Sequence, residues 1–215
     1  MPDLPCPDEW EYEDAPDHVR ILRERTLYLL RSVRSASMAD KLRHARDTRN
    51  IHGRYFKDLT PQGFPYFAGH YRGEGHRCLN NYEVGIQGDP RVGHTAATVP
   101  MEMDKFSEDM RSQLALVEHH LGAPQRIFSA SDKLVSYIRF VAALFVYFLE
   151  IHPYANGNGH IARTIVLLLL GRNNIYPRQA WTIEPKPADP PYTNLISRYR
   201  SGDQDPLVQF IVKAI

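Results

Sequence analysis

A polar segment, His152 to Arg163, interrupts the most apolar part of the chain. It contains two histidines, two asparagines, two glycines and one arginine. The glycines allow a tight turn and a close approach of the backbone to a ligand. A helix starting at Asn158 and Gly159 would direct its unpaired N–H groups and positive dipole end into this turn. Because helix N-termini bind phosphate oxygens, we expect a phosphate site at residues 157–159.

Three side chains of the segment are spaced to act together. Asn156, His160 and Arg163 lie at i, i+4 and i+7, so they share one face if helical geometry extends back to Asn156. Arg163 is then placed to contact a phosphate, and His152 to act as a general base across the turn. A capping role for His152 and ordinary turn chemistry for Gly-Asn-Gly stay open from the residues alone.

The flanking elements are expected to be helical. Residues 132–151 and 158–170 are apolar all round, which is typical of buried central helices. Further helices are expected at 100–121, 192–199 and 206–214. Residues 18–49 are expected to form one helix or two, with a break at 35–37. Residues 73–101 are interpreted as a long loop with a weak hairpin, having β-like pieces at 82–86 and 98–99. Residues 1–16 are expected to form a flexible or loosely docked lead. The predicted fold class is mostly α with a minor β element.

The composition is typical of a globular protein and argues against some classes of partner. The chain has 215 residues, 43% hydrophobic and 24% charged, with a formal net charge of +1, as in ordinary globular proteins. No basic face for nucleic acid is evident, and the apolar run 161–170 is too short to span a bilayer. Cys6 and Cys78 are expected to be reduced thiols, and the acidic start does not resemble a signal peptide. We expect a cytoplasmic protein without nucleic-acid or membrane partners.

The polar segment resembles the signature of the Fic family, His-Pro-Phe-x-Asp/Glu-Gly-Asn-Gly-Arg-x-x-Arg. Seven of its nine specified positions are present when Tyr154 is counted as the aromatic residue. Residues 67–72, Phe-Ala-Gly-His-Tyr-Arg, look like the family's Trp-Ala-Gly-x-Tyr-Arg segment. Thr98-Val99-Pro100-Met101 resembles the end of its flap, and residues 202–211 resemble its C-terminal helix. The resemblance implies a Fic-like helical bundle with a small β-hairpin flap over 45–215, preceded by a lead and helical extension at 1–44.

The resemblance also implies an activity. Most Fic enzymes transfer AMP from ATP, with magnesium, to a Ser, Thr or Tyr hydroxyl of a target protein. By position, His152 would take the hydroxyl proton. The inner phosphates would be held by Gly157, Asn158 and Gly159. The nucleotide site would be completed by His160 and Arg163. Thr98, Val99 and Pro100 would dock the target segment by strand pairing. The family's self-inhibitory motif, Ser/Thr-x-x-x-Glu-Gly/Asn, is absent.

Two positions depart from the signature. Asn156 replaces the acidic metal ligand, and an amide oxygen brings magnesium no negative charge. His160 replaces the first arginine and makes no bidentate phosphate contact. We therefore expect a magnesium ion that the protein holds weakly, with ATP as the leading nucleotide. Another phosphate-containing donor, a small-molecule acceptor and an inactive nucleotide-binding module remain the alternatives.

Overall fold

The structure is a computed structural model of residues 1–215, described here for residues 4–86, 89–178 and 180–215. Eight α-helices account for most of this described part: α1 (His18–Ser35), α2 (Met38–Arg46), α3 (Arg49–Phe56), α4 (Val99–Gly122), α5 (Ala130–Ile151), α6 (Asn158–Arg172), α7 (Tyr192–Arg200) and α8 (Asp205–Lys213). The mostly α fold class is therefore confirmed.

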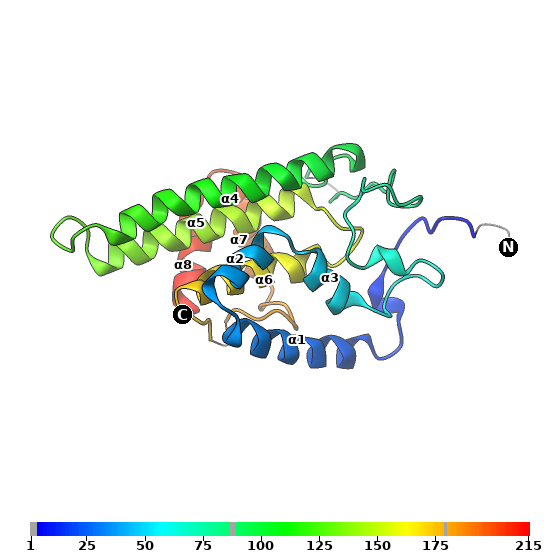
Figure 1. Cartoon of the computed structure of the whole chain (residues 1–215), viewed down its shortest axis with the longest axis horizontal. Helices are drawn as coiled ribbons and strands as arrows, with labels where there is room; N and C mark the ends of the chain where they lie inside the picture. The colour runs from blue at the N-terminus through cyan, green and yellow to red at the C-terminus, as the bar shows by residue number, and fades with distance from the viewer. Residues whose placement is uncertain (1–3, 87–88, 179) are drawn as a thin grey trace.

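Helices α5 and α6 form the centre of the molecule. Every residue of α6 from Ile161 to Gly171 is buried, and α5 buries eleven side chains, as their all-round apolar character predicts. Helix α4 packs along α5 on one side, α1 and α2 pack against α6 on the other, and α7 and α8 close the bundle near the C-terminus (Figure 1). The turn between α5 and α6 thus projects from the core itself. Helix α5 alone is long and apolar enough to span a bilayer among the described residues, but here it is a core helix.

The helix boundaries agree closely with the sequence prediction, with a few differences. The break between α1 and α2 falls at residues 36–37, inside the predicted window. Helix α5 begins at Ala130, two residues before the predicted start at residue 132, because Ser129 caps it and Asp132 completes the capping box from inside the helix. Helix α3 lies beyond the predicted helical range 18–49 except for its first residue, Arg49, and was not predicted from the sequence.

The expected β pieces are not formed in the described residues. The pairing seen there is an isolated bridge between Ile86 and Asp89. Thr98 ends a 3-10 turn, and Val99 starts α4 with Pro100 in its first turn, where a missing N–H costs nothing. The prediction of an extended piece at 98–99 is wrong, and residues 87–88 of the predicted hairpin-containing loop 73–101 lie outside the described residues.

The described part of the N-terminal lead, residues 4–16, is firmly attached, contrary to expectation. Trp10 is only 3% exposed, and its Nε1–H donates to the Leu59 carbonyl at 2.8 Å. Cys6 and Cys78 form a disulfide, so the expectation of two reduced thiols is also wrong. Because Trp10 belongs to the same hydrophobic core as α5 and α6, the lead is part of the folded unit. The domain boundary at residue 44 stays a prediction.

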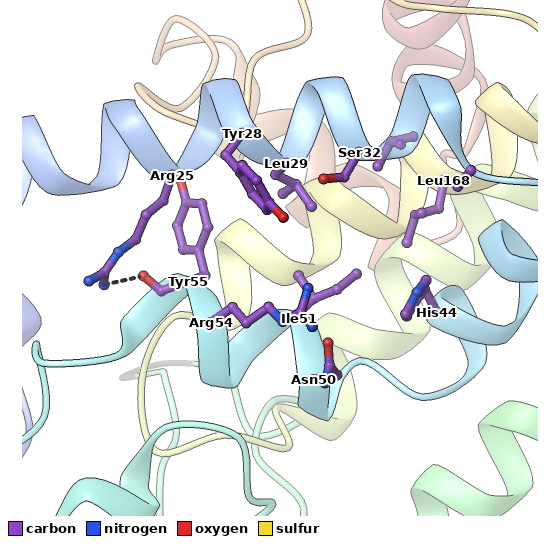
Figure 2. Close-up of a pocket in the computed structure, with 12 residues that line it drawn as sticks. Arg25, Tyr28, Leu29, Ser32, His44, Asn50, Ile51, Arg54, Tyr55 and Leu168 are labelled. Carbon is purple, nitrogen blue, oxygen red and sulfur yellow. Dashed lines mark hydrogen bonds between the residues drawn. The ribbon is translucent and has the colours of Figure 1, made fainter.

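A small cavity of about 120 Å³ lies beneath α1 (Figure 2). It is enclosed by α1, α2, α3 and α6, and the Arg25 guanidinium beside it donates to the Tyr55 carbonyl at 2.9 Å. None of its lining residues belongs to the segment His152–Arg163. This cavity is therefore separate from the site described next.

Candidate active site

His152 occupies the C-terminal end of α5, where the chain turns out of the helix. Its φ of 53° places it in the left-handed region, and its Nδ1 lies 3.0 Å from the Leu149 carbonyl oxygen. Because a carbonyl only accepts, Nδ1 carries the proton of the neutral ring and Nε2 keeps its lone pair. Burial lowers the pKa of His152 to about 4. The ring is therefore an unprotonated base at neutral pH.

The buried Arg72 fixes the backbone on both sides of His152. Its side chain is fully buried, and it donates to the carbonyl oxygens of His152, Ile151, Tyr82 and His94 at 2.8–3.3 Å. A guanidinium has five donors and fits such a set of carbonyls well. Burial lowers the pKa of Arg72 to about 10, so it keeps its charge at neutral pH. Arg72 joins the end of α5 to the loop at 82–94.

The turn between the two central helices is held by internal hydrogen bonds. The side chain of Asn158 accepts from the Tyr154 N–H at 2.9 Å and donates to the Tyr154 carbonyl at 2.8 Å. His52 accepts from the Gly69 N–H and donates through Nε2 to the Asn156 carbonyl at 3.1 Å, with its ring stacked on Tyr154. These contacts set the direction in which α6 begins.

The start of α6, residues 157–159, forms a backbone turn that we call the cradle, and phosphate binding there stays a prediction. Gly157 has a φ of 77°, which a residue without a side chain adopts freely. Within the described part of the chain, no acceptor meets the backbone N–H groups of Asn158 and Gly159. They are the first donors of a 15-residue helix, so the dipole adds a positive potential at the same place. The cradle can hold an anion such as a phosphate group.

The base and the cradle line one cavity of about 360 Å³. Its walls contain seven residues of the segment His152–Arg163, including all the site residues predicted there. Two sequence-distant segments complete it: the N-terminal lead contributes Tyr12, and the connector before α7 contributes Glu184, Pro185 and Lys186. Asn156 lies outside α6, so the predicted helical alignment is wrong, but the turn at Gly157 still brings Asn156 into the same cavity.

Both polar ends of the Asn156 side chain already have partners. Its Nδ2 donates to the Trp10 carbonyl at 2.7 Å and to Glu11 Oε2 at 3.0 Å. Its oxygen accepts from the Gly157 N–H at 2.5 Å. Asn156 therefore fastens the N-terminal lead to the turn. Among the described residues, no group of three His, Cys, Asp or Glu side chains is arranged to hold a metal ion.

His160 and Arg163 are also engaged by the connector. His160 is 6% exposed, and its Nε2 lies 2.9 Å from Glu184 Oε2, while Tyr12 packs edge-on against its ring. Burial lowers the pKa of His160, and the hydrogen bond from His160 lowers the pKa of Glu184. The pair is thus a neutral imidazole donating to a charged carboxylate. Arg163 donates through Nε and Nη2 to the Ile183 carbonyl at 3.1 and 2.8 Å.

Target docking by Thr98, Val99 and Pro100 stays a prediction. Val99 is fully buried and all three residues adopt helical turns, so they present no extended edge in this state. His94 and Gly93 instead pair their N–H groups with the carbonyls of Ile151 and Glu150. The loop beside His152 is held by these bonds and by Arg72.

A base at a helix end and free N–H groups at the next helix start therefore line the same cavity. A protein-family model, Fic/DOC family, matches residues 43–170, more than half of the chain. The chain belongs to the Fic/DOC family, whose members are generally transferases of nucleotidyl or other phosphate-containing groups. A comparison with curated proteins finds no match.

Four residues of the cavity were missed by the sequence prediction: Tyr12, Glu184, Pro185 and Lys186. They lie in proline-rich stretches without helical or strand periodicity, so no pattern indicated where they would fold. Trp10 was the available signal for the lead, because a tryptophan in an otherwise acidic segment is seldom left in water.

Proposed function

We propose that the protein transfers a nucleoside monophosphate from a nucleotide to a hydroxyl group of a target protein. One observation supports this most directly: the unprotonated His152 and the free N–H groups of the cradle line the same cavity. Transfer of a phosphate-linked group needs a base for the acceptor and fixed dipoles for the charge that develops on phosphate oxygens. Family membership supports the same class of reaction.

In the proposed reaction, the acceptor oxygen attacks the innermost phosphorus of the nucleotide. His152 Nε2 takes the hydroxyl proton as the new P–O bond forms, and the bond to the outer phosphate breaks. The N–H groups of Asn158 and Gly159 stabilise the phosphate oxygens without having to reorganise. The Leu149 carbonyl holds the imidazole in the orientation and tautomer that this step requires.

The site does not fit a magnesium ion held by protein carboxylates. The Asn156 oxygen already accepts a hydrogen bond and carries no charge, while magnesium favours carboxylate and phosphate oxygens. We therefore propose that any magnesium ion arrives on the phosphates of the nucleotide, and that the protein contributes no step through it. ATP, with AMP as the transferred group, is the first donor to test, because it is the common donor in the family.

Intact-mass spectrometry after incubation with each nucleotide, magnesium and a cell lysate tests this function. The added mass identifies the transferred group on the protein or on a target. We expect His152→Asn to abolish transfer, since asparagine tolerates the left-handed backbone at this position but is not a base. His119→Ala is the matched control, because His119 is exposed on α4, and it should transfer normally.

The alternatives give different results. Transfer that persists in His152→Asn would contradict the assigned base. Nucleotide binding by calorimetry without any product would identify a binding module instead of an enzyme. The double variant Asn156→Asp with His160→Arg restores the family signature, and increased AMP transfer would show that the natural residues disfavour ATP. Loss of transfer in that variant would indicate that they serve another donor.

A further inference from the structure

The Arg163 guanidinium already has hydrogen-bond partners within the protein, so it is not free to bind the third phosphate of a nucleotide. Two of its nitrogens donate to the Ile183 carbonyl, and Arg163 is only 4% exposed. The third nitrogen, Nη1, lies beside Gly159, where a Cβ would come within 3.1 Å of it. Arg163 can therefore reach a phosphate that sits on the cradle, but it is not extended toward a phosphate farther out.

A carboxylate occupies the cavity beyond the cradle. Glu184 lines the cavity at the side of His160, with Oε2 2.9 Å from the imidazole Nε2 and its side chain 17% exposed. The other cation of the cavity, Lys186, is paired with Asp189 at 3.0 Å. Both His160 and Lys186 are already partnered, and Arg23, which also interacts with Glu184, lines the second cavity described below instead of this one. An additional anion among the residues that line the first cavity therefore meets the Glu184 charge.

The negative charge of the donor's phosphates then determines which class of nucleotide binds best beside Glu184. The terminal phosphate of a triphosphate carries about −1.5 to −2 charges at pH 7, because its second pKa is near 6. A phosphate that is esterified on both sides cannot lose this second proton and carries one negative charge. A diphosphate whose second phosphate is esterified is thus much less anionic than a triphosphate, and it brings no third phosphate into the cavity.

A second cavity of about 630 Å³ shares Glu184 and Pro185 with the first. Its walls are mainly apolar and aromatic, formed by α1 and the connector, and three arginines belong to its lining. The lining includes Leu27, Leu30, Leu167, Tyr176 and Trp181, and the arginines are Arg23, Arg34 and Arg178. Pockets of this size and character bind organic groups that have a flat or apolar face. Arginine stacks on planar rings, as Arg34 does on Tyr176 at 5.4 Å.

We propose that the donor is a nucleoside diphosphate whose second phosphate is esterified to a flat or apolar organic group, and that this group occupies the second cavity. The inference rests on the proposed function and specifies its donor. The hydroxyl oxygen of the target forms a bond to the first phosphorus, and the bond from this phosphorus to the bridging oxygen breaks. The leaving group is the phosphate monoester of the organic group, which departs with the electron pair, and His152 takes the proton.

Isothermal titration calorimetry on the full-length protein tests the donor class. Each nucleoside is presented in three forms: the triphosphate, the free diphosphate and a substituted diphosphate. The substituted probes are NAD⁺ and FAD for adenosine and the phenyl esters of GDP, UDP and CDP for the other nucleosides, because each carries a flat ring beyond its second phosphate. We expect at least one substituted diphosphate to bind about tenfold tighter or more than the triphosphate of the same nucleoside, because a like charge a few ångströms away costs this much or more. Intact mass then shows whether the bound donor transfers its nucleoside monophosphate.

Two variants with matched controls test whether the Glu184 charge and the second cavity determine which donor binds. Glu184→Gln should strengthen triphosphate binding about fivefold or more by removing the opposing charge, while the exposed Glu108→Gln should not. Leu27→Trp should weaken the substituted diphosphate but not the free diphosphate, since Leu27 lines the second cavity and is 57% exposed. Leu116→Trp is its control, because Leu116 is 64% exposed on α4 and lines neither cavity.

The possible failures are distinguishable. If ATP or another triphosphate binds as tightly as every substituted diphosphate and is transferred, the proposed function stands and the donor class is wrong. If no nucleotide of any form binds, both are wrong. Equal triphosphate affinity in wild type and Glu184→Gln would also overturn the assigned role of the Glu184 charge.

Discussion

Replacing Gly157 by alanine tests the geometry of the cradle directly. Two costs are expected. The left-handed backbone at a φ of 77° costs an alanine about 1–2 kcal/mol. The added Cβ would also lie 2.3 Å from Cε2 of Phe56, a fully buried ring. Overpacking of this kind costs about 1–3 kcal/mol more. The expected loss in the free energy of unfolding is the sum of the two, about 2–5 kcal/mol.

Gly75→Ala separates the two costs. Gly75 has a similar φ of 84°, but a Cβ there would meet no atom within 4 Å. Its variant should lose only the backbone contribution of about 1–2 kcal/mol. Urea denaturation of both variants and the wild type, followed by tryptophan fluorescence and circular dichroism, gives the comparison. Equal stabilities of Gly157→Ala and Gly75→Ala would refute the close packing of Phe56 against the turn, and with it the described direction of the first α6 N–H groups.

Two further predictions concern the lead and the base. Cys6→Ser should lower the free energy of unfolding by about 4 kcal/mol under non-reducing conditions, because the disulfide joins residues 72 positions apart. With a reductant present, the variant and the wild type should unfold alike; a difference that persists in reductant would mean that the cysteines contribute by packing instead. For the base, the rate of transfer should stay constant from pH 8 to about pH 5 and fall as His152 becomes protonated near its lowered pKa of about 4. An acid limb near pH 6.5 in initial-rate measurements of kcat/KM would contradict the burial of this ring.

The helical core and the central site were accessible from the sequence because local rules agree there. All-round apolar stretches indicated α5 and α6, and glycines with free helix N–H groups indicated the cradle between them. The Fic signature supplied the role of His152, which spacing alone left open. These features depend on residues close together in the chain, where periodicity and turn chemistry are informative.

The remaining walls of the cavity depend on contacts between distant segments. Glu184 follows His160 by 24 residues and reaches it through a proline-rich connector, which has no period to predict its path. Glu11 meets Asn156 across 145 residues. A disulfide between Cys6 and Cys78 has no local signal either, since it depends on how the lead folds back. Long-range packing decided each of these, and sequence spacing carries no information about it.

The partners found for Asn156 and His160 change how the departures from the Fic signature should be understood. An acidic residue at position 156 would stand close to the Glu11 carboxylate, whereas the asparagine amide donates to it and to the Trp10 carbonyl. A neutral histidine at 160 donates to Glu184 while fitting beneath the Tyr12 ring. Each departure is matched by a residue outside the signature, and the base, the cradle and Arg163 are kept around the same cavity. Both replacements are thus accommodated by specific partners in this chain, which agrees with the proposal that the site takes a different donor.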